Sequence, residues 1–173
     1  MEHLNIEIKA RCNDQETIRK YLKYHDAKFK GLDHQLDTYF NVPNGRLKLR
    51  EGEIENFLIH YERLDQEGPK QSKVALFALK PGSTLKEALT KALGILAVID
   101  KKREIYFIDN VKFHVDLVKD LGTFMEIEAI DKDGIFSKDQ LEEQCQKYLN
   151  EMGIKSEDLI SVSYSDLLLK SKL

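Results

Sequence analysis

The segment LNIEIKAR, residues 4–11, alternates apolar and polar side chains without interruption. One set of alternate positions is apolar and comprises Leu4, Ile6, Ile8 and Ala10. The other set carries an amide, a carboxylate, an ammonium and a guanidinium, on Asn5, Glu7, Lys9 and Arg11. Successive side chains of a β-strand point to opposite faces, so this period of two predicts a strand with one apolar and one ionic face. The ionic face either meets solvent, as in an ordinary edge strand, or lines a site.

Five later segments repeat the same alternation of an apolar face and a polar face. They are RLKLRE at 46–51, FLIHYER at 57–63, IDKKREIYF at 99–107, HVDLV at 114–118 and TFMEIEAI at 123–130. Taken alone, each could be an exposed strand, and the acidic pair of the last could belong to a surface ladder of salt bridges. The charged residues that share one face of their segment are Arg46, Lys48, Arg50, Arg63, Lys101, Arg103, Asp116, Glu126 and Glu128, although the segment at 99–107 also carries Lys102 and Glu104 on its other face.

Strand-like segments recur along the chain, and amphipathic helices fill the gaps between them. The helix at 137–152 opens with Ser137 and Gln140 at the spacing of a capping box and stops at Gly153. Eight antiparallel strands make a sheet large enough to curl or close, so we predict an α+β fold. The expected strands lie near 3–12, 35–41, 46–51, 56–64, 73–80, 97–108, 111–117 and 122–131, and the expected helices near 13–26, 83–93, 137–152 and 165–170.

The apolar stripes of the helices need a surface to cover, and the apolar faces of the strands provide it. The ionic faces would then meet inside a closed sheet, where each buried ion costs several kcal/mol unless it is paired. A wet tunnel that binds a highly charged ligand removes this difficulty. Arginines and lysines on neighbouring strands would surround a polyphosphate, and carboxylates would hold Mg²⁺ or Mn²⁺.

Length and composition fit one globular domain over residues 1–173. Hydrophobic residues make up 42% of the chain and charged residues 33%, with 27 Lys and Arg against 30 Asp and Glu, for a net charge of −3. This near balance argues against a general nucleic-acid-binding protein, which would show a basic excess. The two cysteines, Cys12 and Cys145, form no CxxC pair, and we expect reduced thiols, as in a cytosolic protein.

The two ends of the sequence bear on its location. The start, MEHLNIEIKA, is charged and strand-like, so it predicts no signal peptide, and the longest apolar run, LGILAVI at 93–99, is too short to span a membrane. The last three residues, Ser171, Lys172 and Leu173, would be a peroxisomal signal only in a eukaryote. We therefore expect a cytoplasmic protein with neither a membrane nor a nucleic acid as partner.

Six segments in this order and spacing resemble the CYTH superfamily, which joins class IV adenylyl cyclases, thiamine triphosphatases and inorganic triphosphatases. The segments are NIEIK, DTYF, LKLRE, YER, IDKKREIY and LGTFMEIE, and the tail SYSDLLL is similar to the adenylyl-cyclase-like branch. The resemblance implies a closed or nearly closed eight-stranded antiparallel β-barrel, the triphosphate tunnel, with helices packed outside. Relatives in this superfamily are often dimers, so the resemblance also allows a homodimer.

The resemblance implies a role for each polar position. A divalent ion, Mg²⁺ or Mn²⁺, is expected at Glu7, Asp116, Glu126 and Glu128. A triphosphate is expected at Lys9, Lys48, Arg50, Arg63, Lys101 and Arg103, with Arg11 and Arg46 as weaker matches. Three further residues are candidates to face the lumen or support catalysis: Asn5, Tyr39 and Lys73.

The sequence departs from the family pattern at two places. The motif ExExK of the first strand has Asn5 in place of its first glutamate, and an amide offers an oxygen but no charge. An acidic RxExE pattern that often follows in cyclase-like members is absent, because Lys73 is followed by Val74 and Ala75. Both departures remove carboxylates, so they bear on the number of metal ions and on how tightly they bind.

The expected ligand is a small molecule with a triphosphate: ATP, thiamine triphosphate or inorganic triphosphate. In hydrolysis, water attacks the terminal phosphorus; in cyclisation, the ribose 3′-hydroxyl attacks the α-phosphorus and pyrophosphate leaves. We favour a metal-dependent triphosphate phosphohydrolase, with a class IV adenylyl cyclase second. A non-catalytic binder of triphosphates or nucleotides is the third hypothesis, because carboxylates are missing.

Overall fold

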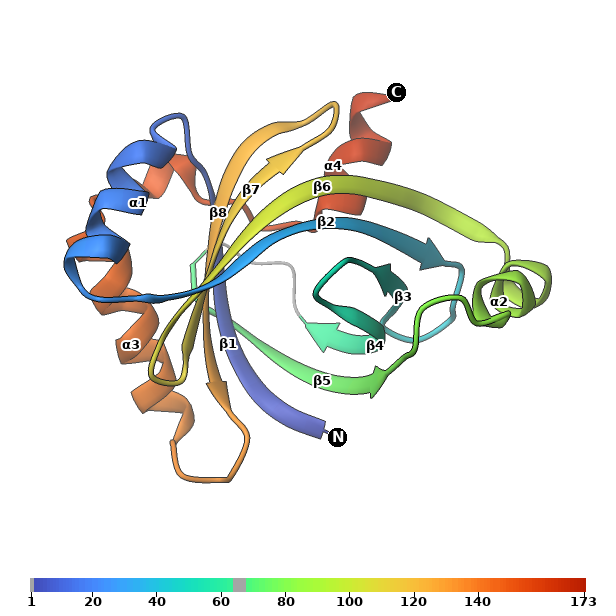
Figure 1. Ribbon diagram of the computed structural model, residues 1–173, viewed down its shortest axis with the longest axis horizontal. Helices are drawn as coiled ribbons and strands as arrows, with labels where there is room; N and C mark the ends of the chain where they lie inside the picture. The colour runs from blue at the N-terminus through green and yellow to red at the C-terminus, as the bar shows by residue number, and fades with distance from the viewer. Residues whose placement is uncertain (1, 64–67) are drawn as a thin grey trace.

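Eight antiparallel strands close into a barrel in the order β1-β5-β4-β3-β2-β6-β7-β8 (Figure 1). The computed structural model describes residues 2–63 and 68–173. The strands are β1 (Glu2–Arg11), β2 (Lys28–Phe40), β3 (Arg46–Glu51), β4 (Asn56–Arg63), β5 (Lys70–Ala78), β6 (Ile95–Ile108), β7 (Val111–Val118) and β8 (Gly122–Asp131). The helices are α1 (Gln15–Tyr24), α2 (Leu85–Leu93), α3 (Lys138–Glu151) and α4 (Tyr164–Ser171), with a 3₁₀ turn at Ser156–Asp158. The predicted α+β class and eight-stranded antiparallel barrel are confirmed.

The strand β2 is longer than predicted because its first half pairs with β6. The register joins Lys28 to Phe107 and Asp37 to Ile99, with a bulge between Phe29 and Gly31. A bulge bends a strand and increases its twist, which helps a sheet to close. Gly31 has a φ of +145°, and a Cβ there would lie 2.6 Å from Cδ1 of Ile54. A pairing of this length depends on the partner strand, so local sequence alone did not predict it.

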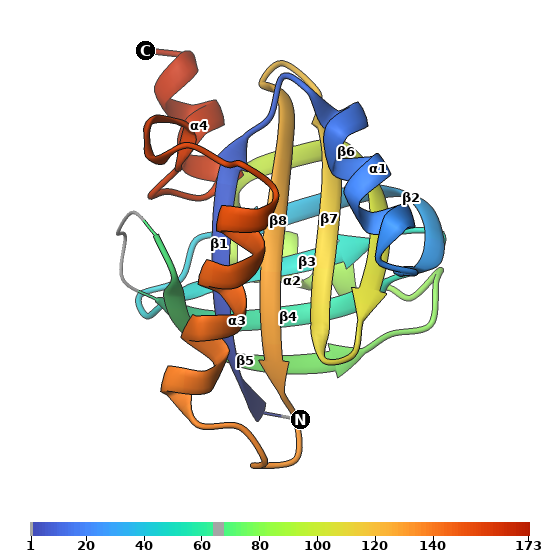
Figure 2. The same ribbon diagram turned by 90° about the vertical axis from the view of Figure 1, so that its left-hand side faces the viewer.

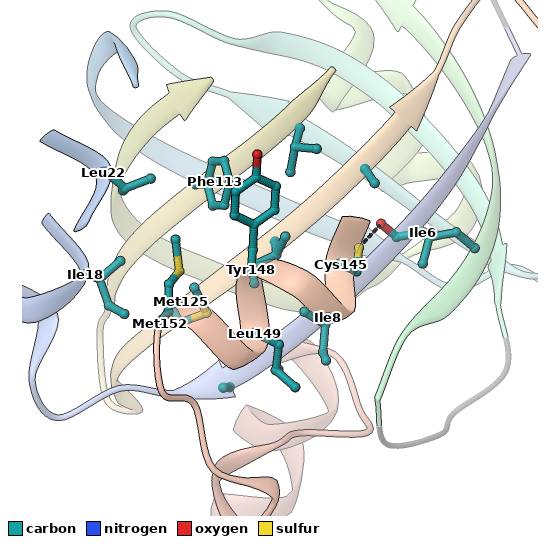
Figure 3. Close-up of a cluster of buried hydrophobic side chains, with 14 of the residues drawn as sticks. Ile6, Ile8, Ile18, Leu22, Phe113, Met125, Cys145, Tyr148, Leu149 and Met152 are labelled. Atoms are coloured by element: carbon teal, nitrogen blue, oxygen red, sulfur yellow. Dashed lines mark hydrogen bonds between the residues drawn. The ribbon is translucent and has the colours of Figure 1, made fainter. Parts of the chain in front are cut away.

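The main apolar core lies outside the barrel, between the strands β1, β7, β8 and the helices α1 and α3. Figure 2 shows α3 running along β1 and β8, and Figure 3 shows the side chains that it buries. Ile6 and Ile8 point outward from β1 into this core, where Cys145 Sγ donates to the Ile6 carbonyl over 3.3 Å. The rings of Phe113 and Tyr148 meet edge to face with centroids 4.9 Å apart. The apolar side chains of the first strand therefore pack against helices, as predicted, and its polar side chains face the inside of the barrel.

Local capping signals place the helix ends. Ser137 accepts from the backbone N–H of Gln140, and the side chain of Gln140 accepts from the backbone N–H of Ser137. The capping box predicted at the start of α3 is confirmed, and α1 begins after a side-chain cap from Asp14. These caps satisfy backbone groups that the first helical turn leaves without partners.

A second apolar cluster joins α4 to the barrel. It includes Phe124, Tyr164 and Leu168, and the rings of Phe124 and Tyr164 lie 4.9 Å apart. In Figure 1, α2 lies on the side of the barrel away from α1 and α3. Among the described residues, none of the helices combines the length and the apolar character needed to cross a membrane.

We predict that Phe113→Ala lowers the free energy of unfolding by about 3–5 kcal/mol, because it opens a cavity in the outer core. The matched control is Phe77→Ala, since Phe77 is 65% exposed whereas Phe113 is fully buried. Urea unfolding of both variants measures the difference. Equal losses in the two variants would contradict the position of the core outside the barrel.

Candidate active site

The polar faces of the strands meet in a cavity of about 230 Å³ inside the barrel. Carboxylates of Asp37 and Asp116 are buried just behind its lining. Among the described side chains, cations outnumber carboxylates in the lining. The cations are Lys9, Lys30, Lys48, Arg50, Lys101, Arg103, Lys112 and Lys132, and the carboxylates are Glu7, Glu55, Glu126 and Glu128.

A single carboxylate, that of Asp37 on β2, holds three cationic side chains. Its Oδ2 lies 2.7 Å from Lys101 Nζ, 2.8 Å from Arg50 NH2 and 3.2 Å from Lys48 Nζ. Burial by itself would raise the pKa of Asp37, but the charges of Arg50, Lys101 and Lys48 lower that pKa well below its ordinary value. Glu55 also contacts Arg50, but these two carboxylates face four cations, the three above and Lys112. This part of the tunnel therefore attracts an anion.

Burial also acts on the cations of this cluster. Lys101 is 2% exposed, and its burial together with the neighbouring charge of Arg103 lowers the pKa of Lys101 well below its ordinary value. A bound phosphate next to the ammonium would favour its charged form. The cluster is therefore better suited to an occupied tunnel than to an empty one.

Asp116, predicted as a metal ligand, holds Arg103 in the structure. Its two oxygens accept from Arg103 Nε at 2.8 Å and Arg103 NH2 at 2.5 Å, and Oδ2 also accepts from the hydroxyl of Tyr164 at 2.8 Å. Asp116 is fully buried and does not line the cavity. Both oxygens take part in this pairing, so Asp116 fixes the guanidinium in the tunnel wall, and its role as a metal ligand stays a prediction.

Glu126 lines the cavity beside two cations and an imidazole, which come from three other strands. Its carboxylate lies 3.3 Å from Lys9 Nζ, 3.3 Å from Arg103 NH2 and 2.9 Å from His114 Nδ1. Burial alone would raise the pKa of Glu126, but Arg103 and Lys9 hold that pKa well below its ordinary value. Burial and the charge of Arg103 lower the pKa of His114 to about 4, so this ring is neutral at pH 7. Lys9 also lies 3.9 Å from the centroid of the Tyr164 ring.

Two further carboxylates face the lumen as a pair, with an amide beside them. Glu7 on β1 is directly opposite Glu128 on β8, and Nδ2 of Asn5 donates to Oε1 of Glu128. Oδ1 of Asn5 is buried and has no hydrogen-bond partner among the described residues. Two carboxylates and an unpartnered amide oxygen form the oxygen-rich donor set that Mg²⁺ and Mn²⁺ prefer.

These residues fit a divalent ion, with water and phosphate oxygens as its further ligands. Within residues 2–63 and 68–173, no group of three or more His, Cys, Asp and Glu side chains is arranged to hold a metal ion. The amide of Asn5 is therefore needed to complete a protein-side set with Glu7 and Glu128. An ion of this kind is reluctant to lose all its water, so a site completed by substrate phosphates suits it.

Comparison with known proteins agrees with this geometry. The sequence model of the CYTH domain matches residues 3–164. The chain belongs to the CYTH domain family. A Methanocaldococcus jannaschii protein named "Putative adenylate cyclase" is 29% identical over 178 residues, which cover 95% of this chain and 98% of that protein.

Two solved structures show the same fold. A Pyrococcus horikoshii protein is 26% identical with a TM-score of 0.77, and the match covers 94% of this chain and 98% of that one. A Hippeastrum protein, described as an adenylyl cyclase with a dominant triphosphatase activity, is 13% identical with a TM-score of 0.65, over 99% and 97% of the two chains. At this level of identity, the second likeness concerns the fold alone.

Most of the positions that the CYTH resemblance selected meet in the tunnel, and a few do not. Arg46 on β3 does not line the cavity and pairs with Asp166 of α4 at 2.8 Å. Arg11 is exposed and does not line the cavity, and its guanidinium lies 5.0 Å from the centroid of the Phe124 ring. The side chain of Arg63 lies outside the described part of the structure. The positions brought together are Asn5, Glu7, Lys9, Tyr39, Lys48, Arg50, Lys101, Arg103, Glu126 and Glu128.

Lys73, considered for the lumen, lies on the outer face of the barrel. Its neighbours Ser72 and Val74 line the cavity, and Lys73 itself is exposed, paired in register with Leu4 and Glu62. Strand alternation therefore excludes it from the tunnel.

Sequence reasoning did not assign roles to several side chains of this CYTH tunnel. Lys112 and His114 share the parity of Asp116 on β7, and Asp37 shares that of Tyr39 on β2, so alternation could have found them. Glu55 lies in the turn before β4 and Tyr164 on a helix, where no strand period applies. The residues without an assigned role are Asp37, Glu55, Lys112, His114 and Tyr164.

We predict that Asp37→Asn lowers the free energy of unfolding at pH 7 by about 3–5 kcal/mol, because buried cations lose their common partner. Inorganic triphosphate should restore part of the loss by supplying negative charge to the same cations. Urea unfolding with and without the anion measures both effects, with Asp133→Asn as the control because Asp133 is exposed.

The sign of the pH dependence follows from the lowered pKa of Asp37. The unfolded chain binds a proton at this group below its ordinary pKa of 3.8, and the folded protein binds it only at lower pH. The stability that Asp37 contributes is therefore present above pH 3.8 and is lost as the pH falls below it. The difference in free energy of unfolding between the wild type and Asp37→Asn should therefore become smaller in that acid range. A difference that does not change with pH would contradict the role assigned to Asp37.

Proposed function

We propose that this CYTH protein is a divalent-metal-dependent triphosphate phosphohydrolase. The observation that carries the proposal is the Asp37 cluster, in which one buried carboxylate holds Lys48, Arg50 and Lys101. Such a cluster is poorly neutralised without a polyanion, and flexible ammonium groups beside a guanidinium suit phosphate oxygens. Arg103 and Lys9 extend the cationic wall on the neighbouring strands.

The size of the cavity supports hydrolysis over cyclisation. Pockets for drug-sized molecules measure roughly 300–1,000 Å³, and this cavity measures about 230 Å³. This volume suits a chain of phosphates and lies below the range of pockets that enclose a whole drug-sized molecule. The organic group of an organic triphosphate would then remain near the mouth, where Phe107, Lys30 and Lys132 lie. Cyclisation requires the ribose and the α-phosphorus together in a defined pose, which this cavity favours less.

The residues of the tunnel divide the chemical work between them. Lys48, Lys101 and Arg103 bind the non-bridging oxygens and stabilise the negative charge that develops on them. Glu7, Glu128 and Asn5 would hold Mg²⁺ or Mn²⁺, which when bound neutralises phosphate charge and helps the leaving group to depart. Water attacks the terminal phosphorus, the bridging P–O bond breaks, and the proton of the attacking water passes to solvent or to the released phosphate.

A class IV adenylyl cyclase is the second candidate. The Methanocaldococcus jannaschii relative, which is 29% identical across almost the whole chain, carries an adenylate cyclase name. The Hippeastrum protein shows that the same tunnel fold is compatible with a dominant triphosphatase activity in a protein that has a cyclase name. The two reactions share the metal and the phosphate-binding residues, and they differ in which phosphorus is attacked.

We predict phosphate release, without cyclic AMP, when purified protein is incubated with Mg²⁺ or Mn²⁺. The panel comprises ATP, thiamine triphosphate and inorganic triphosphate, with products separated by ion-exchange chromatography. Removal of the metal with a chelator should abolish turnover. Cyclic AMP with pyrophosphate would establish the cyclase instead, and tight binding without any product would identify a non-catalytic binder.

Glu128→Gln should reduce metal-dependent turnover by about 10–100-fold or more, because it removes one of the two carboxylates facing the lumen beside Asn5. Raising the Mn²⁺ concentration should recover part of the rate. The control is Glu143→Gln on α3, which makes the same charge change at an exposed position outside the barrel. Unchanged metal dependence in Glu128→Gln, with the fold verified by circular dichroism, would contradict the assigned metal site.

A further inference from the structure

The carboxylate of Glu55 lies inside the tunnel although the residue belongs to the turn between β3 and β4. Its Oε2 accepts from Arg50 NH1 at 3.2 Å and from Gln35 Nε2 at 3.2 Å, and Oε1 accepts from Lys112 Nζ. The residue is 4% exposed and lines the cavity. A protein carboxylate thus occupies the space between two cations, Arg50 on β3 and Lys112 on β7, that a phosphate could otherwise bind.

Hydrogen bonds hold the backbone of this turn in place. The carboxylate of Asp33 accepts from the backbone N–H groups of Glu53, Ile54 and Glu55 at 2.7, 2.9 and 3.0 Å. A Cβ at Gly52 would lie 2.7 Å from Oδ2 of Asp33, so the turn wraps closely around the buried acid. Glu55 is therefore a fixed anion of the tunnel wall, unlike an acidic side chain on a mobile surface loop.

The position of Glu55 relative to the Asp37 cluster matters for a bound chain of phosphates. Arg50 contacts Asp37 through Nε and NH2 and contacts Glu55 through NH1, so the guanidinium connects the two acids. A phosphate chain held by Lys48, Lys101 and Arg50 would have Glu55 as its next neighbour on this side. Burial alone would raise the pKa of Glu55, but Lys112 and Arg50 lower that pKa far below its ordinary value, so the group is negative at neutral pH.

We propose that Glu55 is a specificity-determining residue that limits the length of the phosphate chain the tunnel accepts. The carboxylate partly neutralises Arg50 and Lys112 and repels any further phosphate that approaches them. A triphosphate fits the cationic wall on the near side of Glu55, and a longer chain meets a fixed negative charge. This inference rests on the proposed function, since it concerns the ligand of the same site.

A purely structural ion pair makes a different prediction from a length-limiting anion. If Glu55 only stabilised the barrel, its loss would change the affinities for all anions by the same factor. If it limits chain length, its loss changes the ratio between a longer chain and a triphosphate. The ratio of two dissociation constants is therefore the decisive quantity, because overall destabilisation cancels from it.

The test measures binding of inorganic tripolyphosphate and tetrapolyphosphate by isothermal titration calorimetry to the wild type, Glu55→Gln and Glu53→Gln, in the presence of a chelator so that neither chain is hydrolysed during the titration. Glu53 is exposed in the same turn, so its variant makes the same charge change outside the tunnel. We expect the wild type and Glu53→Gln to bind tripolyphosphate at least tenfold more tightly than tetrapolyphosphate. In Glu55→Gln, the two constants should lie within about threefold of each other.

The outcomes separate this inference from the proposed function. A ratio in Glu55→Gln equal to that of the wild type overturns the inference, as does a wild type that binds both chains equally. Failure of the proposed function is detected separately, as absence of phosphate release by the wild type. A wild type that binds no tripolyphosphate overturns both. If Glu55→Gln does not fold, the double variant Glu55→Gln/Lys112→Gln keeps the net charge of the tunnel and should also lose the discrimination.

Discussion

The sharing of one buried carboxylate, that of Asp37, among three cationic side chains is the interaction on which the tunnel depends. It brings the ionic faces of β2, β3 and β6 together and leaves positive charge incompletely neutralised. Repulsion among these cations would separate the strands of an open sheet. In this protein the hydrogen bonds of a closed barrel hold the strands together. The unfavourable charge is thereby kept in place and becomes affinity for an anion.

The position of the apolar core explains how the barrel tolerates an ionic interior. Helices α1 and α3 cover the outer faces of β1, β7 and β8, so hydrophobic burial stabilises the fold from outside. The inside is then released from the requirement to be apolar. The carboxylates of the interior fall into two groups. Those of the first group contact cations and belong to Asp37, Asp116, Glu55 and Glu126. Those of the second group, Glu7 and Glu128, lie opposite each other beside Asn5.

The sequence predicted the direction of strand side chains well and their partners poorly. Alternation placed Lys9 inside the barrel, the CYTH resemblance selected Lys101 and Arg103, and all three line the cavity. Alternation also placed Asp116 inside, but it could not reveal that Arg103 and Tyr164 occupy the oxygens of that carboxylate. Glu55 was not predicted, because a turn has no period and its inward direction comes from hydrogen bonds to Asp33.

By itself, the sequence determined the number of strands, the inward ionic face and the outward apolar face, because backbone geometry fixes side-chain direction within each strand. Capping residues likewise determined where α3 begins. Only the tertiary structure decided which charges meet, since Lys112 contacts Glu55 and Tyr164 contacts Asp116 across elements far apart in the chain. Those contacts depend on strand order, register and closure, which are properties of the whole barrel and of no single segment.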